Sequence, residues 1–328
     1  MPDEPLCTIH VGVGGRGAWP LGLMAGDGRF RPVALVDIRA DTLEAARRTA
    51  GLPPEACHAE LGEALRRHPA AEAVVVITPS ALHAPLLAQA LHAGRHVLVE
   101  KPFTNDLADA ERLVALGERL GRRLVVAQNY RFRPVERTVR RLLAEGRYGD
   151  PAYVTLIHHR HRPEVRAFTM AQPMLYEMSV PHFDSLLAML QRPPRAVAAT
   201  SFNPPWSRYP GPAAVQALIE FAGGVQVTYL GTFTSHSDSW ETRIECAGGA
   251  LHWTAHGPLR ALLPGGETAE VPLDHVGLTP EAQILDAFWR YVREGEEPEI
   301  SGRRNLDTLR LVCACIDASS QDRKIRFA

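Results

Sequence analysis

The stretch His96-Val97-Leu98-Val99-Glu100-Lys101-Pro102-Phe103 decides how the first part of the chain folds and where it can do chemistry. Its apolar run follows Gly94, at the end of a helical pattern, and is typical of a strand buried in a parallel sheet. A carboxylate, an ammonium group and a proline end the strand, and such charges are costly to bury unless something pairs or uses them. Open parallel sheets bind ligands at the carboxyl ends of their strands, so Lys101 is the first catalytic candidate. The alternative is that the two charges simply end the strand in solvent.

A dinucleotide-binding pattern lies near the amino terminus. A predicted strand over residues 8–11 leads into Gly12-Val13-Gly14-Gly15-Arg16-Gly17, whose glycines permit a tight turn and a close approach of the backbone to a pyrophosphate. A second predicted strand, over residues 33–36, ends at Asp37. A carboxylate there can accept hydrogen bonds from the ribose hydroxyls of NAD and repels the 2′-phosphate of NADP, whereas Arg39 keeps NADP possible. The alternative for Asp37 is an acid that caps a helix or lies in a loop.

Strands and helices alternate through the first 128 residues. Further strands are predicted over residues 73–77 and 123–127, and helices over residues 41–50, 81–93 and 106–120. Repeated units of this kind with short connections specify a doubly wound parallel sheet covered by helices.

Residues at the ends of these strands are further candidates for contact with a cofactor. Thr78 and Pro79 follow the third long strand, and Asn129 follows the last one. Glu100 ends the strand quoted first. His83 is near enough in sequence to reach a nicotinamide or ribose, although its place in a predicted helix favours a structural role.

Composition limits the classes of partner. A chain of 328 residues with a formal net charge of -1 and no block of like charge has no electrostatic footprint for nucleic acid or an anionic membrane. The partner is therefore expected to be a small molecule. No signal peptide or membrane-spanning run is recognised, and the five cysteines show no zinc or disulfide spacing. We expect a cytoplasmic protein without a metal site.

The pattern changes after residue 128. Helices are predicted over residues 134–144, 280–294 and 305–318, and strands over residues 152–160, 196–202, 214–221, 224–232 and 241–247. The successive strands and glycine-rich turns predict a second, α+β domain, residues 129–328, with a large open and mostly antiparallel sheet. A sheet face without helices would expose apolar surface, which favours a homo-oligomer.

Several polar and aromatic residues of this second part are candidates for the substrate site. Arg131 is placed to reach the substrate or a cofactor phosphate, although surface solvation is common for such residues. His159 and His161 alternate onto one face of a predicted strand, and without a nearby carboxylate or cysteine they favour a polar site for a sugar over a metal site. The aromatic side chains that could border this site are Trp206, Tyr209 and Trp240.

Several motifs in the first part of the chain include residues at or just after the end of a predicted strand. They are Gly12 to Gly17, Asp37, Thr78-Pro79-x-x-x-His83, His96-Val97-x-x-Glu100-Lys101-Pro102 and Asn129-Tyr130-Arg131-Phe132-x-Pro134. Together they resemble the glucose-fructose oxidoreductase and inositol dehydrogenase (GFO/IDH/MocA) family, over essentially the whole chain. The resemblance implies a Rossmann domain, residues 1–128, that holds NAD or NADP, followed by an α/β domain for the substrate and for a homodimer or homotetramer.

The resemblance also implies an activity. Members oxidise or reduce secondary alcohols on sugars, polyols and related small molecules, with Lys101 bonded to the reacting hydroxyl and the Lys101–Pro102 bond in the cis form. Two other functions stay open, which are an NAD-assisted glycosidase and a dinucleotide-binding regulatory protein without the ordinary reaction.

One motif departs from the family pattern. Members carry an acid, then a histidine four residues later, then an aspartate three residues after that. Here Glu177 and Asp184 match, but Pro181 stands at the histidine position and His182 follows it. In an uninterrupted α-helix His182 would lie about 140° around from Glu177. Three readings remain: His182 serves as acid and base, Lys101 works without a histidine, or the ordinary reaction is lost. The structural alternative for His182 is a residue at the start of a helix that is exposed to water. Asp184 is expected to orient a neighbour or hold the substrate.

Overall fold

The computed structural model describes residues 4–163 and 171–327, which form two compact units. The first contains the described residues up to Asn129 together with Leu278–Leu306, and the second contains Tyr130–Gly277 and the described residues from Asp307 onward. The sequence placed the first boundary one residue earlier and assigned everything after it to a single second domain. Residues 278–306 therefore belong to a different unit from the one expected.

The first unit is built on a six-stranded sheet with parallel neighbours in the order β3-β2-β1-β4-β5-β6. The strands are β1 (Leu6–Val11), β2 (Phe30–Val36), β3 (Cys57–His58), β4 (Ala73–Val76), β5 (His96–Glu100) and β6 (Leu124–Ala127). The helices are α1 (Ala18–Gly26), α2 (Ala40–Ala50), α3 (Leu61–Arg67), α4 (His83–His92), α5 (Leu107–Arg119) and α8 (Pro280–Arg293), with short 3₁₀ turns η1 (Gly15–Gly17), η2 (Pro54–Ala56) and η3 (Ser80–Leu82). This confirms the predicted doubly wound sheet, whose strand order reverses between β1 and β4.

The interior of this sheet explains why its strand ends are fixed. Val97, Leu98 and Val99 of β5 have no exposed surface, as expected for a strand covered on both faces. Burying each such side chain contributes about 1.5–3 kcal/mol. The polar residues that follow are therefore held at the edge of a rigid layer.

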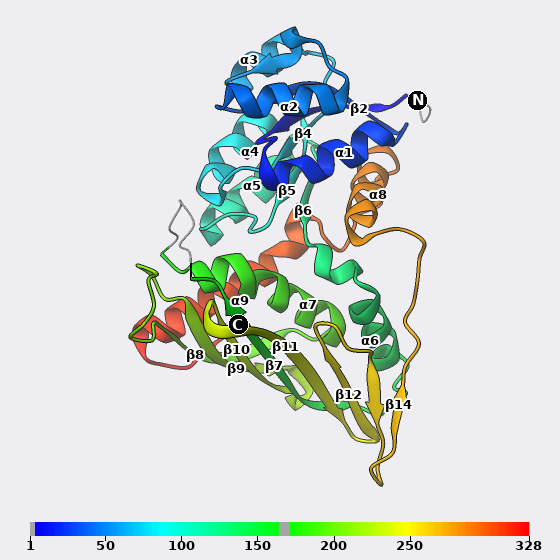
Figure 1. Cartoon of the computed structure of the whole chain (residues 1–328), viewed down its shortest axis with the longest axis vertical. Helices are drawn as coiled ribbons and strands as arrows, with labels where there is room; N and C mark the ends of the chain where they lie inside the picture. Colours follow the sequence, from blue (N-terminus) through cyan, green and yellow to red (C-terminus); the bar gives the residue numbers. More distant parts are fainter. Residues whose placement is uncertain (1–3, 164–170, 328) are drawn as a thin grey trace. The chain divides into compact units, whose positions relative to one another are not determined.

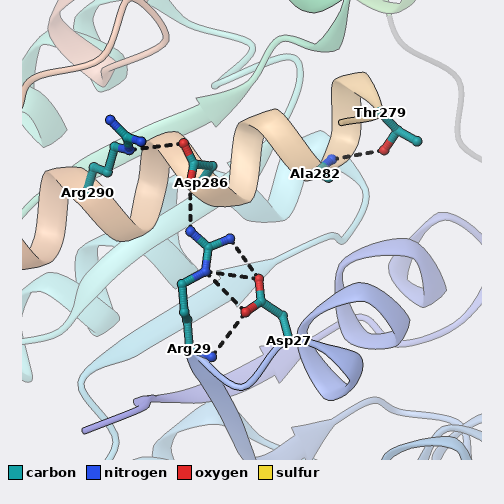
Figure 2. Close-up of polar contacts among 6 residues, drawn as sticks. All are labelled: Asp27, Arg29, Thr279, Ala282, Asp286 and Arg290. Atoms are coloured by element: carbon teal, nitrogen blue, oxygen red, sulfur yellow. Dashed lines mark hydrogen bonds and ion pairs between the residues drawn. The ribbon is translucent and has the colours of Figure 1, made fainter. Parts of the chain in front are cut away.

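Helix α8 joins the first unit through ion pairs that the sequence pattern does not reveal. Figure 2 shows the guanidinium of Arg29 between the carboxylates of Asp27 and Asp286, with Nη1 2.6 Å from Asp286 Oδ1. The hydroxyl of Thr279 accepts a hydrogen bond from the Ala282 amide and caps the start of α8. Helix α8 lies beside α1 (Figure 1), although more than 250 residues separate Arg29 from its partner in the sequence.

The second unit is built on a nine-stranded sheet in the order β14-β13-β12-β11-β7-β10-β9-β8-β15. The strands are β7 (Pro151–His161), β8 (Pro194–Phe202), β9 (Ala214–Phe221), β10 (Gln226–Thr232), β11 (Thr234–Cys246), β12 (Gly249–Thr254), β13 (Arg260–Leu262), β14 (Thr268–Glu270) and β15 (Ile325–Arg326). All described neighbours are antiparallel except β7 and β10, so the predicted mostly antiparallel sheet is confirmed.

The helices of the second unit gather on one face of this sheet (Figure 1). They are α6 (Pro134–Ala144), α7 (Val180–Leu190) and most of α9 (Gly302–Gln321), and the short turns are η4 (Asn129–Phe132), η5 (Leu175–Ser179) and η6 (Ala222–Gly224). Val154 and Leu156 of β7 pack with Phe183 and Leu186 of α7 in the core. On the other face the side chain of Leu218 is 61% exposed.

Within residues 4–163 and 171–327, no helix is both long and apolar enough to cross a membrane. The same residues hold no group of three or more His, Cys, Asp or Glu side chains that could bind a metal ion. The five cysteines are free thiols.

A buried ion pair joins η4 to α7 in the second unit. Arg131 Nε lies 2.6 Å from Asp184 Oδ2 and its Nη2 lies 2.9 Å from Oδ1, while Thr308 of α9 donates to the same carboxylate. The side chains of Arg131 and Asp184 are only 9% and 1% exposed. Arg131 was expected to reach the substrate or a cofactor phosphate, and Asp184 to orient a neighbour or hold the substrate. The structure shows the two holding three elements together, because each satisfies the other away from solvent.

We predict that Asp184→Asn lowers the free energy of unfolding by about 3–5 kcal/mol, because the guanidinium of Arg131 then stays buried without this carboxylate. The matched control is Asp307→Asn, which removes an exposed partner of Arg310 in the same unit and should cost no more than about 1 kcal/mol. Urea unfolding followed by circular dichroism measures both. Equal losses for the two variants would contradict a buried, structural pair.

Candidate active site

The glycine loop after β1 has a conformation that only glycine permits. Gly12 has a φ of +78°, and a Cβ atom added there would lie 2.4 Å from the carbonyl oxygen of Ile77. A Cβ on Gly17 would lie 1.8 Å from the carbonyl oxygen of Gly12. Gly15, with a φ of +52°, faces open space within 4 Å. The loop therefore packs tightly against the sheet and presents bare backbone outward, which fits the pyrophosphate of a dinucleotide.

A cavity of about 740 Å³ lies beside this loop, where the strand order reverses. Its lining includes Gly12, Gly14, Gly15, Asp37, Thr78 and Pro79, six of the residues expected to bind the cofactor. The Asp37 carboxylate accepts hydrogen bonds from the amides of Val13 at 3.1 Å and Arg39 at 3.0 Å. Each carboxylate oxygen keeps further acceptor capacity, so Asp37 can still take hydrogen bonds from ribose hydroxyls. These residues fit NAD.

Arg39 also lines the cavity, but its guanidinium is paired with Asp41. Nη2 lies 2.6 Å from Asp41 Oδ2, and the two side chains are 68% and 69% exposed. An ion pair so exposed contributes at most about 1 kcal/mol. A 2′-phosphate could therefore compete with Asp41 for the guanidinium of Arg39. The geometry favours NAD without excluding NADP.

Glu100 is buried at the end of β5 and links that strand end to the glycine loop. Its Oε1 accepts from Arg16 Nε at 2.9 Å and from Trp19 Nε1 at 3.4 Å, while Oε2 accepts from the Lys101 amide at 2.8 Å. Both Glu100 and Arg16 were expected to bind the cofactor. The structure makes Glu100 a support for the loop and for Lys101, and a direct contact of Glu100 or Arg16 with the cofactor stays a prediction.

His83 joins the ends of β4 and β5. Its Nδ1 lies 2.8 Å from the carbonyl oxygen of Pro102, and its Nε2 lies 3.0 Å from that of Thr78. Burial lowers the pKa of His83, and the nearby carbonyls oppose this effect. The Lys101–Pro102 bond is cis, which confirms that expectation. The ring nitrogens therefore hold the backbone around Lys101, and the structural alternative fits His83 better than direct cofactor contact.

Asn129 was expected to bind the cofactor at the end of β6. Its amide Nδ2 instead donates to Glu281 Oε1 of α8 at 3.1 Å. This contact explains part of the attachment of α8 to the first unit. It also leaves Asn129 outside the lining of the cavity beside the glycine loop.

The departure at Pro181 is absorbed by a π-helical turn. Residues Leu175–Ser179 form this turn, and the Val180 amide donates to the carbonyl of Leu175, five residues back. Pro181 follows this turn directly, and its missing amide hydrogen removes the bond that an uninterrupted α-helix would make to the Glu177 carbonyl. Each residue of a π turn advances less than 100° around the axis, so His182 lies closer to the line of Glu177 than the 140° of an uninterrupted α-helix.

His182 is buried among four aromatic rings, which we call the His182 cluster. The ring centroids of Tyr130, His158, Tyr229 and Trp240 lie 5.9, 4.8, 5.7 and 5.5 Å from that of His182. Arg133 stacks over Tyr130, with 3.2 Å from its Cζ to the ring centroid. His182 has no exposed surface, so it is not the solvated residue of the alternative reading. A substrate can contact His182 only if one of the surrounding side chains moves.

His158 was missed by sequence reasoning, which selected His159. Val154, Leu156 and His158 share the buried face of β7, because side chains alternate along a strand, and this alternation was the available signal. His159 lies on the opposite face, with Nδ1 3.3 Å from Ser239 Oγ. Neither ring nitrogen of His158 has a hydrogen-bond partner among the described residues, and burial lowers its pKa to about 4. The geometry therefore favours His158 over His159 as a polar group available to a ligand.

Glu177, the acid of the motif, lies in the π turn and is only partly buried. Its Oε2 lies 2.5 Å from Nη1 of Arg162, and the two side chains are 19% and 16% exposed. A carboxylate in this position can accept a hydrogen bond from a hydroxyl group while the guanidinium balances its charge. Of the two acids of the motif, Glu177 is the more accessible, because the side chain of Asp184 is only 1% exposed.

Comparison with known proteins agrees with this geometry. Residues 9–128 match an oxidoreductase family with an NAD-binding Rossmann fold, GFO/IDH/MocA, and residues 137–252 match the GFO/IDH/MocA C-terminal domain. Inositol 2-dehydrogenase of Streptomyces avermitilis is 31% identical over 271 residues, which are 80% of this chain and 75% of that protein. The chain belongs to the GFO/IDH/MocA family.

One further relative and one solved structure also resemble this chain. The uncharacterized protein y4oX of Sinorhizobium fredii is 29% identical over 237 residues, covering 69% of this chain and 65% of y4oX. The crystal structure of the aldose-aldose oxidoreductase from Caulobacter crescentus, complexed with glycerol, superposes with a TM-score of 0.88. That match covers 98% of this chain and all of the other, at 21% identity, and it shows that this GFO/IDH/MocA protein shares the fold.

We predict that Asp37→Ser weakens NAD binding about tenfold to a hundredfold, because hydrogen bonds from hydroxyls to a charged acceptor are lost. NADP binding should fall less, since the repulsive carboxylate is gone. Calorimetric titration with both cofactors measures this. The control Asp41→Ser, which breaks the exposed pair with Arg39 and the local bonds from Thr42 to the same carboxylate, should leave NAD binding within about twofold. An unchanged ratio of NADP to NAD affinity in Asp37→Ser would remove Asp37 from cofactor selection.

Glu136 lies in the first turn of α6, three residues from the Arg133 that stacks on Tyr130. It is 2% exposed, and neither carboxylate oxygen has a hydrogen-bond partner among the described residues. Arg133 Nη1 lies 3.8 Å from Glu136 Oε1, beyond hydrogen-bond distance. Burial raises the pKa of Glu136 to about 7, so the folded protein holds a proton there that the unfolded chain releases near pH 4.3.

We predict that Glu136 makes stability fall as pH rises from about 4.3 to about 7, because the folded state binds more protons across this window. Glu136→Gln keeps the shape and cannot ionise. It should therefore be more stable than the native chain at pH 8 by about 1–3 kcal/mol, with a smaller difference at pH 5. Urea unfolding at both pH values tests this. A difference that does not change with pH would show that Glu136 does not titrate in this range.

Proposed function

We propose that this chain is an NAD(P)-dependent oxidoreductase that transfers a hydride between nicotinamide and a secondary alcohol or ketone of a sugar, polyol or sugar derivative. The observation that carries the proposal is the use of lysine in this chain. Of 36 basic residues only Lys101 and Lys324 are lysines, and all the others are arginines. One of these two lysines follows the buried strand β5, next to the support built by Glu100 and His83.

Lysine and arginine differ in one property that matters there. A guanidinium stays protonated at any physiological pH, whereas an ammonium can release its proton when its surroundings disfavour the charge. Apart from Lys324, every other Lys or Arg position in this chain is an arginine, whereas position 101 carries a side chain with an exchangeable proton. This is what a donor or acceptor for the proton of a reacting hydroxyl requires.

The division of labour follows from the residues present. The bound cofactor supplies the nicotinamide carbon that accepts or gives up the hydride. Gly12, Gly15 and Asp37 hold the dinucleotide. Lys101 hydrogen-bonds the substrate oxygen, stabilises the charge that develops on it and passes the hydroxyl proton on. Glu177 holds a second substrate hydroxyl, and His182 takes up or returns the hydroxyl proton.

The π turn favours a catalytically active site over a site that has lost the ordinary reaction. A proline at the histidine position would remove the histidine from an uninterrupted helix, but the added residue of the turn brings the next one, His182, toward the side of Glu177. We infer that His182 and Lys101 act together. The inositol dehydrogenase and aldose-aldose oxidoreductase among the similar proteins support polyols and sugars as substrates.

Two further expectations stay predictions. A cytoplasmic location rests on cysteine usage in the sequence. A homodimer or homotetramer through the open sheet face rests on that face, where a hollow of about 590 Å³ is lined by Leu218, Leu230 and Ile157, among others.

The test of the reaction uses the purified full-length chain with NAD⁺ or NADP⁺ and a panel of polyols and sugars. Nicotinamide absorbance should rise with at least one compound that carries a secondary alcohol. Release of an aglycone from a glycoside without net NADH would instead show an NAD-assisted glycosidase. Tight NAD binding with no turnover on any substrate would favour a regulatory protein.

We predict that Lys101→Ala leaves cofactor affinity nearly intact and lowers turnover about a hundredfold or more, because the proton partner of the substrate is lost. Lys101→Arg keeps the positive charge but not the exchangeable proton, so it should recover little activity. Lys324→Ala, which removes the only other lysine and breaks an exposed pair with Glu220, is the matched control and should behave like the native chain. Full activity in Lys101→Ala would remove this residue from the mechanism.

A further inference from the structure

A chain of buried hydrogen bonds leads from the π turn to His182. The hydroxyl of Ser179 donates to the carbonyl oxygen of Met174 at 3.2 Å. Ser179 Oγ also lies 2.9 Å from Tyr229 Oη, which in turn lies 2.9 Å from His182 Nδ1. Ser179, Tyr229 and His182 have at most 1% exposed surface, so water does not compete for these bonds.

The carbonyl at one end fixes the direction of every bond in this chain. Because a carbonyl only accepts, the single hydroxyl hydrogen of Ser179 is used on Met174. Ser179 Oγ must then accept from Tyr229, and Tyr229 Oη must accept from His182 Nδ1. In the reverse direction Ser179 would donate to Tyr229, and the bond to Met174 would be lost. The forward direction makes three hydrogen bonds and the reverse makes two.

The position of the tyrosine hydroxyl is itself constrained. Gly231, two residues along β10, leaves the space that the hydroxyl fills, because a Cβ atom there would lie 2.5 Å from Tyr229 Oη. The same Cβ would lie 2.3 Å from Cε of Met174. The ring of Tyr229 also packs edge to face on Phe183, with ring centroids 4.9 Å apart. Tyr229 is therefore held in one place as an acceptor for His182.

We propose that Ser179 and Tyr229 are positioning residues that hold His182 with its permanent proton on Nδ1, so that Nε2 is the nitrogen that takes up and releases a proton. Neutral imidazole carries one proton, and this network places it on Nδ1. When His182 is charged, Nδ1 keeps its proton and only Nε2 gains one. The catalytic consequence rests on the proposed function, since the proton gained at Nε2 is the one lost by the substrate hydroxyl.

The π turn connects this arrangement to the departure in the sequence. The backbone of the turn places Ser179 five residues after Met174, within reach of its carbonyl. The turn therefore both rotates His182 toward Glu177 and supplies the acceptor that sets the direction of the hydrogen bonds.

The tautomer can be observed directly by ¹⁵N–¹H NMR of the full-length chain labelled with ¹⁵N-histidine. The chain has 14 histidines, and His182→Gln identifies the signals of the ring in question. We expect a protonated Nδ1 and an unprotonated Nε2 in the neutral state. A protonated Nε2 with an unprotonated Nδ1 would overturn the proposal.

The variant Ser179→Ala gives a sharper test, because it predicts a reversal. Without Ser179, the tyrosine hydroxyl has its hydrogen free to donate to His182 Nδ1, so the proton of His182 should move to Nε2. Ser185→Ala, a buried serine further along α7, is the matched control and should keep the native tautomer. If Ser179→Ala is folded and keeps the proton on Nδ1, the network does not set the tautomer.

Turnover separates this proposal from the proposed function. Ser179→Ala should lower kcat about tenfold or more at unchanged NAD affinity, while Ser185→Ala should not. If the NMR result is as expected but the native chain oxidises no alcohol, the proposed function fails and the tautomer assignment stands. If the native chain is active and the native tautomer is the reverse one, the proposed function stands and the positioning by Ser179 and Tyr229 fails.

Discussion

The first unit depends on one buried carboxylate. Glu100 sits where β5 ends, and a carboxylate without partners in such a place would be costly to desolvate. The protein satisfies it with Arg16 of the glycine loop, with Trp19 of α1 and with the amide of Lys101. The same group thus links the loop that fits a pyrophosphate to the backbone of Lys101.

The elements of the first unit could be predicted from the sequence because their signals are local. Apolar runs of strand length, glycines with forced conformations and helix caps each act within a few residues. The attachment of α8 could not be predicted, since it depends on Asp286 meeting Arg29 from a distant part of the chain. Ion pairs of this kind leave no periodic trace. The same reason explains Asn129, whose amide turned out to meet Glu281.

The candidate site was predicted unevenly for a related reason. Residue types at strand ends located Lys101, Asp37 and the glycine loop, because parallel strands bring their carboxyl ends to one edge. The partners of those residues were not predictable. Arg131 and Asp184 have the chemistry of substrate ligands, yet they neutralise each other in the interior. The alternation of side chains along β7 could have identified His158. The sequence prediction followed only the face that carries His159 and His161.

The motif around Pro181 shows how backbone geometry can offset a change in spacing. A sequence records that a histidine has moved by one position, but not whether the helix accommodates the shift. The outcome depends on whether a wider turn can be stabilised. Here the Ser179 hydroxyl bonds to the Met174 carbonyl, and Tyr229 connects this bond to His182. Both interactions are buried, so the histidine that follows the proline is held by hydrogen bonds that water does not reach.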